Sequence, residues 1–183
     1  AAHRGAGVEG VLGVGGGSVL DAAKAIAGLL HPGNPVEDHL EGIGRDVPYR
    51  GPAVPFVAVP TTAGTGSEAT RNAVITRQGR DGFKKSFRDE QLVAQHAVLD
   101  PDLLASCPPE LIAADGMDAL TQLLESFTSR NACPFTDALA WGGMRAARDG
   151  LPAWHAKGPD AAEARANMQW ASYASGIALA HAG

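Results

Sequence analysis

The chain is poor in cysteine, in clustered basic residues and in long apolar runs, and each shortage excludes a class of protein. Its 183 residues include 2 cysteines, Cys107 and Cys133, which form no CxxC pair, so no disulfide framework is expected. No apolar run approaches the roughly 18 residues that a membrane span needs, and no basic-then-apolar targeting segment is seen. The net charge is −5 and no basic cluster is denser than Lys84-Lys85, which argues against nucleic acid as a partner. We expect no membrane partner and a cytoplasmic location.

The remaining composition is that of a folded globular protein. Hydrophobic residues make up 45% of the chain and charged residues 19%, values close to globular averages, which argues against disorder. A chain of this length can form one domain or parts of two.

The segment from residue 8 to residue 27 predicts an anion-binding turn. An apolar run at Val11, Leu12 and Val14 is flanked by glycine, as in a central parallel strand, and residues 15–17 are glycines that permit close approach of a ligand. Ser18-x-x-Asp21 has the pattern of a capping box at the start of a helix, whose free N–H groups and positive dipole end suit a phosphate. The pattern is neither GxGxxG nor a GxxxxGK[ST] loop. In the alternative interpretation the glycines only make a tight turn, and Ser18 and Asp21 only cap the helix.

A second segment, residues 56–70, has the same order of signals. The β-rich run 56–59 stops at Pro60 and is followed by a loop rich in glycine and hydroxyls. Its Thr61, Thr62, Thr65 and Ser67 can hydrogen-bond a ribose, an amide or a diphosphate. The alternative is that these hydroxyls bond the neighbouring backbone.

A third segment, residues 115–126, predicts a pair of ligands on one helix face. Asp118 and Gln122 stand at i and i+4, a spacing that can present two side chains to a cation.

Four collinear segments together resemble the iron-containing (group III) alcohol dehydrogenase family, whose fold is shared with glycerol dehydrogenase and dehydroquinate synthase. They are GGGSVLDAAK, PTTAGTGSE, the Lys84 region before VLDPDLL, and GMDALTQLLE. The resemblance covers nearly the whole chain. It also implies a further nucleotide-binding strand and helix before the glycine turn and further metal-binding histidines after the last segment. The chain therefore looks like an internal fragment of a longer protein.

The resemblance implies a set of contacts to a dinucleotide, NAD or NADP. The residues that match the family's cofactor contacts are Gly16, Gly17, Ser18, Asp21, Thr61, Thr62, Thr65, Asn72, Lys84 and Leu103. Asp21 has helix capping as an equal alternative, and Lys84 has the alternative of a solvated surface charge. Lys24 is expected to be an i,i+3 partner of Asp21 or a solvated charge rather than a catalytic base.

The resemblance also implies a metal site for Fe²⁺ or Zn²⁺, with Asp118 as a ligand. Gln122 stands where the family usually has histidine, and a neutral amide oxygen is a poor ligand for such a metal compared with imidazole. We therefore expect Gln122 to be a weak or outer ligand, or the site to polarise its substrate by hydrogen bonds without metal. His181 is left unassigned.

The expected fold is a parallel-sheet α/β nucleotide-binding domain over residues 1–107, incomplete at its N-terminal side, followed by an incomplete all-helical domain over residues 108–183, as in dehydroquinate synthase. The expected strands cover residues 11–14, 56–59 and 92–99, with a turn at 79–82. The expected helices cover residues 18–30, 111–127, 136–148 and 161 onward, with Thr136 as a cap and Leu151-Pro152 ending a helix. The loops 15–18 and 61–65 are expected to lie side by side at one crevice.

The function implied by the resemblance is an NAD(P)-dependent alcohol dehydrogenase that transfers a hydride between nicotinamide and a small alcohol, aldehyde or ketone. Two alternatives stay open at this point: a maleylacetate reductase or glycerol dehydrogenase-like oxidoreductase, and a non-catalytic nucleotide-binding module. The full-length protein is expected to be a homo-oligomer, and the fragment is expected to be inactive alone and to expose apolar surface.

Overall fold

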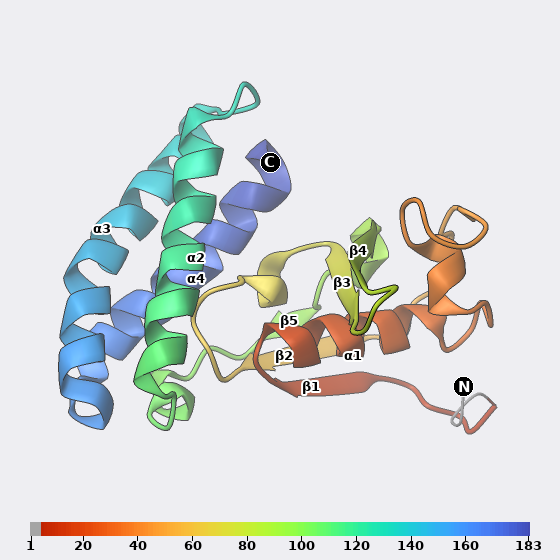
Figure 1. Cartoon of the computed structure of the whole chain (residues 1–183), viewed down its shortest axis with the longest axis horizontal. Coiled ribbons are helices and arrows are strands. Elements are labelled where there is room, and N and C mark those ends of the chain that lie inside the picture. Colours follow the sequence, from red (N-terminus) through yellow and green to blue (C-terminus); the bar gives the residue numbers. More distant parts are fainter. Residues whose placement is uncertain (1–4) are drawn as a thin grey trace.

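A computed structural model describes residues 5–183, and it shows an α/β part followed by three long helices (Figure 1). The α/β part begins with strand β1 (Val11–Gly15), helix α1 (Gly17–Leu29) and strand β2 (Phe56–Pro60), and the short strand β5 (His96–Ala97) completes its sheet. The sheet has the order β1-β2-β5, and both pairings are parallel. This is the α/β architecture that the alternating strand and helix signals predict.

Helix α1 packs closely on the sheet because the strand beneath it contains a glycine. Gly13 is buried, and a Cβ added there would lie 2.9 Å from the Cβ of Ala23 and 3.0 Å from the ring of Phe56. The helix buries Leu20, Ala23 and Ala27 in a core shared with Val54, Phe56 and Ala58. The close packing fixes the direction in which the start of α1 points.

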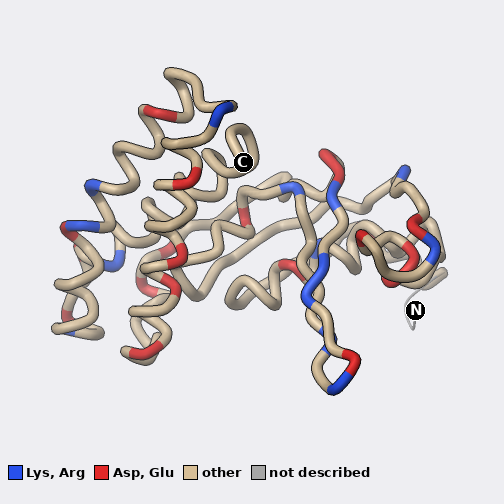
Figure 2. Tube along the Cα trace, turned by 45° about the horizontal axis from the view of Figure 1, so that its top comes forward, with Lys and Arg blue, Asp and Glu red and all other residues tan. Residues whose placement is uncertain are grey.

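An antiparallel hairpin covers α1 from the other side. Strand β3 (Asn72–Arg77) pairs with β4 (Phe83–Arg88), so that Asn72 lies opposite Arg88 and Arg77 opposite Phe83. The sequence predicted only its turn, residues 79–82. Most of the basic residues that the structure describes in the α/β part lie along the hairpin (Figure 2). They are Arg77, Arg80, Lys84, Lys85 and Arg88.

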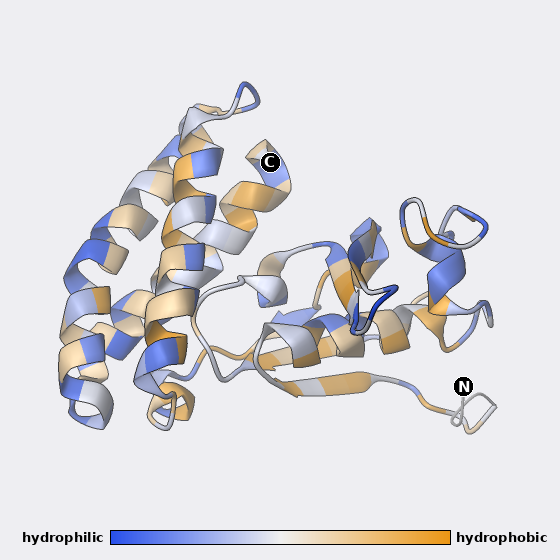
Figure 3. Cartoon of the chain, in the orientation of Figure 1, coloured by the Kyte–Doolittle hydropathy of each residue, from blue (hydrophilic) through white to orange (hydrophobic). Residues whose placement is uncertain are grey.

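The helical part consists of α2 (Pro109–Thr128), α3 (Pro134–Lys157) and α4 (Ala162–Ala182). Hydrophobic and hydrophilic residues alternate around each helix (Figure 3), as expected for helices that bury one face. The shared core of this part contains Ile112, Leu123, Ala140, Ala147, Trp154 and Met168. Helix α2 carries only acidic charges, in contrast to the basic hairpin.

Short 3₁₀ helices occupy the connections. They are η1 (Val36–His39), η2 (Ser67–Ala69), η3 (Glu90–Leu92), η4 (Pro101–Leu104) and η5 (Gly158–Asp160). The expected strand over residues 92–99 is wrong for most of its length, because Leu92 belongs to η3 and only His96 and Ala97 pair with β2.

Two expected helix boundaries are also wrong. Helix α3 begins at Pro134 with Cys133 as its N-cap, and Thr136 is instead the third helical residue, whose hydroxyl oxygen accepts from the Cys133 N–H at 2.9 Å. Pro152 does not end that helix, which continues to Lys157. Trp154, only 1% exposed, lies in the helical core, so tertiary packing holds the turn after the proline in place.

One face of the sheet stays uncovered in the part of the chain that the structure describes. Leu12, Val14 and Val98 are 64%, 53% and 49% exposed. Parallel sheets are ordinarily covered on both faces, so this exposure is the kind of apolar surface expected of a piece of a longer protein. No helix among residues 5–183 combines the length and apolar character required to cross a bilayer.

The two cysteines are expected to differ in reactivity. The exposed Cys133 thiol accepts hydrogen bonds from the backbone N–H groups of Thr136 and Phe135, which lower its pKa, whereas burial raises the pKa of Cys107. Because the thiolate is the reacting species, iodoacetamide at pH 7.5 should modify Cys133 several-fold faster than Cys107. Peptide mass spectrometry over time measures both rates, and equal rates would contradict the expectation. Thr136→Ala removes the further hydrogen bond from the Thr136 hydroxyl to Cys133 Sγ, 3.7 Å long, and should slow Cys133 alone.

Candidate active site

The two predicted loops meet at the C-terminal ends of β1 and β2. Gly15 is paired with Pro60, and the Thr61 N–H donates to the Gly15 carbonyl oxygen at 3.0 Å. A Cβ added to Gly17 would lie 2.6 Å from the side chain of Thr65, so the two loops touch and any larger residue would displace Thr65. The prediction that residues 15–18 and 61–65 lie side by side at one end of the sheet is confirmed.

The start of α1 is open toward these loops. Its N-cap is Gly16, and no side chain makes a capping hydrogen bond to it. The predicted capping box of Ser18 and Asp21 is therefore wrong, because Asp21 turns toward residues far along the chain instead. A helix start without a side-chain cap leaves its N–H groups available to an anion.

A cavity of about 300 Å³ lies between α1, the β3–β4 hairpin, α2 and α4. Its lining brings together predicted residues from both parts of the chain: Gly17, Ser18, Asp21, Thr65, Asn72, Lys84, Asp118 and Gln122. Ser67, Thr70, Val74, Thr76 and Leu179 complete the lining. A groove of about 340 Å³ beside Ile26 has a mostly apolar lining and lies apart from these residues.

The other predicted residues lie outside this cavity. Gly16 faces Thr62, since a Cβ added there would be 3.1 Å from the Thr62 methyl carbon. The Thr62 side chain is hydrogen-bonded to Asp115, and Thr61 directly follows β2. Leu103 belongs to η4 and is 39% exposed. The cofactor roles of all these residues stay predictions.

Asp21 and Lys24 form a buried network with the segment after the second loop. The Lys24 Nζ donates to Thr70 Oγ1 at 2.8 Å and to the Asn72 carbonyl oxygen at 3.0 Å, and lies 3.5 Å from Asp21 Oδ1. The same Asp21 oxygen accepts from Ser67 Oγ at 2.6 Å. Lys24 is thus the i,i+3 partner of Asp21, and the alternative of a solvated charge is wrong because its exposure is 0%.

The network holds more acid than base in a dry environment. Burial raises the pKa of Asp21 and of Glu68, and it lowers the pKa of Lys24 to about 8 against the opposing attraction of Asp21. Sequence reasoning missed Glu68, Thr70 and Ser67 as partners of Lys24 and Asp21. Nothing local marks them, since they stand more than forty positions away.

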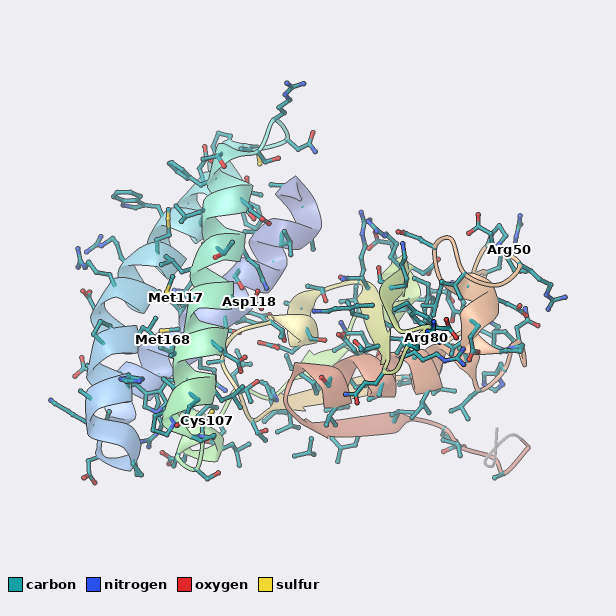
Figure 4. The ribbon with its side chains drawn as sticks, in the orientation of Figure 1. Arg50, Arg80, Cys107, Met117, Asp118 and Met168 are labelled. Atoms are coloured by element: carbon teal, nitrogen blue, oxygen red, sulfur yellow. The ribbon has the colours of Figure 1, made fainter. Side chains whose placement is uncertain are left out.

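Asp118 and Gln122 lie on one face of α2, as the i,i+4 spacing predicted, and are hydrogen-bonded to each other. Gln122 Nε2 donates to Asp118 Oδ2 at 3.0 Å, and Gln122 Oε1 accepts from Ser175 Oγ at 3.0 Å. Asp118 lies on the side of α2 turned toward the α/β part (Figure 4). Partial burial raises the pKa of its carboxyl group, and the charge of Lys84 across the cavity opposes this.

Of the two residues expected to bind a metal, only Asp118 offers a free ligand to a cation. The Asp118 carboxylate lines the cavity and suits a divalent ion, whereas Gln122 turns its N–H group to Asp118 and commits its oxygen to Ser175. No group of three or more His, Cys, Asp or Glu gathers as a metal site within residues 5–183. His181 Nδ1 bonds the Ile177 carbonyl oxygen at 2.9 Å. The metal roles of Asp118 and Gln122 stay predictions.

The lowered pKa of Lys24 predicts how stability changes with pH. From about pH 8 to the ordinary value of 10.5, native Lys24 has lost its proton while unfolded Lys24 keeps it. The unfolded state then binds more protons, so the free energy of unfolding gains up to about 1.4 kcal/mol per pH unit from this group. Urea unfolding of the wild type and Lys24→Met should show a difference that grows in favour of the wild type over this range. The exposed Lys85→Met is the control, and a difference independent of pH would contradict the expectation.

Comparisons with known proteins agree with this arrangement. The family model described as iron-containing alcohol dehydrogenase matches residues 1–101, and the one described as the C-terminal part of the Fe-containing alcohol dehydrogenase family matches residues 112–183. A probable alcohol dehydrogenase, EutG, of Salmonella typhimurium is 42% identical over 180 residues, which cover 98% of this chain and 44% of the relative. An NAD-dependent methanol dehydrogenase of Bacillus methanolicus is 39% identical over 175 residues, 96% of this chain and 44% of the relative.

Solved structures give the same result. The sulfoacetaldehyde reductase of Bifidobacterium kashiwanohense, solved in complex with NAD⁺, superposes with a TM-score of 0.90 at 32% identity, over 98% of this chain and 46% of that one. An iron-containing alcohol dehydrogenase of Thermotoga maritima gives 0.85 at 35% identity, over 100% of this chain and 48% of that one. The chain thus spans less than half the length of these relatives. It belongs to the iron-containing alcohol dehydrogenase family.

Proposed function

We propose that this chain, within a longer polypeptide, forms the NAD(P)-binding part and one wall of the active site of an alcohol dehydrogenase. The enzyme would transfer a hydride between nicotinamide and a small alcohol, aldehyde or ketone. The observation that carries the proposal is that one cavity extends from the start of α1, which has no side-chain cap, to Asp118. We place the boundary between a nucleotide-binding domain and a helical domain at residues 107 and 108.

The roles proposed for the cofactor side follow from what each residue can offer. Backbone N–H groups of Gly16, Gly17 and Ser18 would hold the diphosphate at the start of α1, where the helix dipole favours an anion. Thr65, Asn72 and Lys84 would contact the ribose and diphosphate from the opposite wall. Asp21 lines the same cavity, but its Oδ1 is engaged by Ser67 and Lys24, which favours a role in ordering the loop.

The chain's residues would orient the reactants while the nicotinamide carries the hydride chemistry. NAD is favoured by the relatives named as NAD-dependent or solved with NAD⁺. A divalent cation held by Asp118 would supply Lewis-acid polarisation of the substrate oxygen. Self-association of the full-length protein, a cytoplasmic location and the contacts of Thr61, Thr62 and Leu103 stay predictions.

A second candidate is an oxidoreductase of the same family that works without metal. It is favoured by Gln122, whose N–H donates to Asp118 and whose oxygen is bonded to Ser175. In this candidate, hydrogen bonds alone would polarise the substrate oxygen. Maleylacetate reductase or glycerol dehydrogenase-like activity, and a module that binds nucleotide without turnover, remain alternatives.

Binding of NAD⁺ to the longer protein tests the cofactor side directly. Isothermal titration calorimetry should detect NAD⁺ binding by the wild-type longer protein. Gly17→Ala should weaken the affinity by about tenfold or more, since its Cβ would displace Thr65 and disturb hydrogen bonds to a charged group. Gly142→Ala is the matched control, because Gly142 is a helical glycine with nothing within 4 Å of an added Cβ. Absence of binding by the wild type would refute the proposal.

Metal content tests the other side of the cavity. In the longer protein, Gln122→His should raise the metal occupancy after purification, because imidazole replaces a neutral amide. Asp118→Ala should lower it, and Glu110→Ala, an exposed acid on the same helix, should leave it unchanged. Plasma mass spectrometry measures the content. Stoichiometric metal that survives Asp118→Ala would exclude Asp118 as a ligand, and metal-free protein with full turnover would favour the second candidate.

A further inference from the structure

One turn of α4 contacts residues at both ends of the cavity. Ser172, Ser175 and Gly176 are all buried, with Ser172 and Ser175 at 1% and 0% exposure. None of the three lines the cavity itself. Each of the three contacts either a residue that lines the cavity or the loop that carries such residues.

At the cofactor end this turn fixes the loop between Thr65 and Ser67. The Gly66 N–H donates to Ser172 Oγ at 3.3 Å. Gly66 has a φ of +60°, and a Cβ added to it would lie 2.6 Å from the Gly176 Cα. A Cβ added to Gly176 would in turn collide with the Gly66 carbonyl oxygen. The loop and the helix therefore meet backbone to backbone, with no flexible side chain that can yield.

At the opposite end the same turn fixes the Asp118–Gln122 pair. The Ser175 hydroxyl has one proton and two acceptors within reach, Gln122 Oε1 at 3.0 Å and the Ser172 carbonyl oxygen of its own helix at 2.7 Å. With Gln122 Oε1 turned to Ser175, the Gln122 N–H group points at Asp118. The contact with Ser172 restricts the rotamer of the hydroxyl. Gln122 is thereby held by a buried group of another helix.

We propose that residues 172–176 of α4 are a positioning element that sets the cofactor loop and the Asp118–Gln122 pair relative to each other. The inference rests on the proposed function, because it assigns these residues to that same cavity. Thr65 and Ser67 flank Gly66, and Ser67 bonds Asp21 on α1, so a displaced Gly66 would disturb the wall opposite as well. Small displacements matter because a misplacement of about 1 Å can cost about 100-fold in rate.

The cofactor end is tested by NAD⁺ titration of three folded variants of the longer protein. Gly176→Ala should weaken NAD⁺ binding by about tenfold and Ser172→Ala by about threefold, since the second removes a hydrogen bond without adding bulk. The matched control is Gly150→Ala, a buried helical glycine whose added Cβ would lie 2.8 Å from the Ala164 carbonyl oxygen, at the start of α4. It should lower the melting temperature and leave the NAD⁺ affinity of the folded protein unchanged.

The reacting end is tested in the longer protein by steady-state kinetics. Ser175→Ala should lower kcat several-fold and leave the KM for NAD⁺ within about twofold, and Ser175→Thr, which keeps the hydroxyl, should restore kcat. In a Gln122→Ala background Ser175→Ala should have no further effect, because its partner is already gone.

The outcomes separate the two proposals. A wild-type longer protein that fails to bind NAD⁺ would overturn the proposed function and this inference with it. Wild-type binding with unchanged affinity in folded Gly176→Ala and Ser172→Ala would overturn the inference alone. If Gly176→Ala does not fold, Ser172→Ala decides by itself. An equal loss of affinity in Gly150→Ala would also overturn the inference, because it would show general destabilisation.

Discussion

The buried ammonium group of Lys24 is the interaction on which the cofactor side of the cavity depends. It joins α1 to Thr70 and Asn72, and through Asp21 it reaches Ser67, so one charge ties the glycine turn to the loop after β2. A dry ammonium is stable only when its donors are all used. The elements around the cavity are therefore coupled, because a shift of η2 alone would take the Ser67 hydroxyl away from the buried Asp21 carboxylate.

Charge is distributed across the cavity in a way that would suit the dinucleotide proposed to bind there. The hairpin contributes Lys84 and other basic residues, and α2 contributes only acids, of which Asp118 faces the cavity. The phosphate end can then rely on backbone N–H groups and the helix dipole, which need no basic patch. That arrangement explains how a chain with a net charge of −5 can offer an anion site.

The features that could be predicted from the sequence are those with local signals. Gly15 to Gly17 and the hydroxyl-rich loop after Pro60 each combine a buried strand with residues that end it, and parallel pairing then brings them together. Ser18 and Asp21 also carry a local capping pattern, yet Asp21 bonds Ser67 instead, because a buried carboxylate gains more from the distant hydroxyl and Lys24. The β3–β4 hairpin was missed although Val74, Ile75 and Thr76 are β-branched residues enriched in strands, because the run is short and its partner strand, FKKSFR, is rich in charge. Pro152 was expected to end a helix, but α3 continues past it because Trp154 is buried in the core of the helical part.

The glycines in close contacts around this cavity are of two kinds. Gly17 makes room for Thr65, a side chain that can rotate, whereas Gly66 and Gly176 meet through backbone atoms that cannot. A contact between two rigid backbones transmits a displacement in full, while a side-chain contact absorbs part of it. The Gly66–Gly176 contact is therefore the point at which the helical part determines the shape of the cofactor loop, and it is also the contact least visible in the sequence, because its two residues are more than a hundred positions apart.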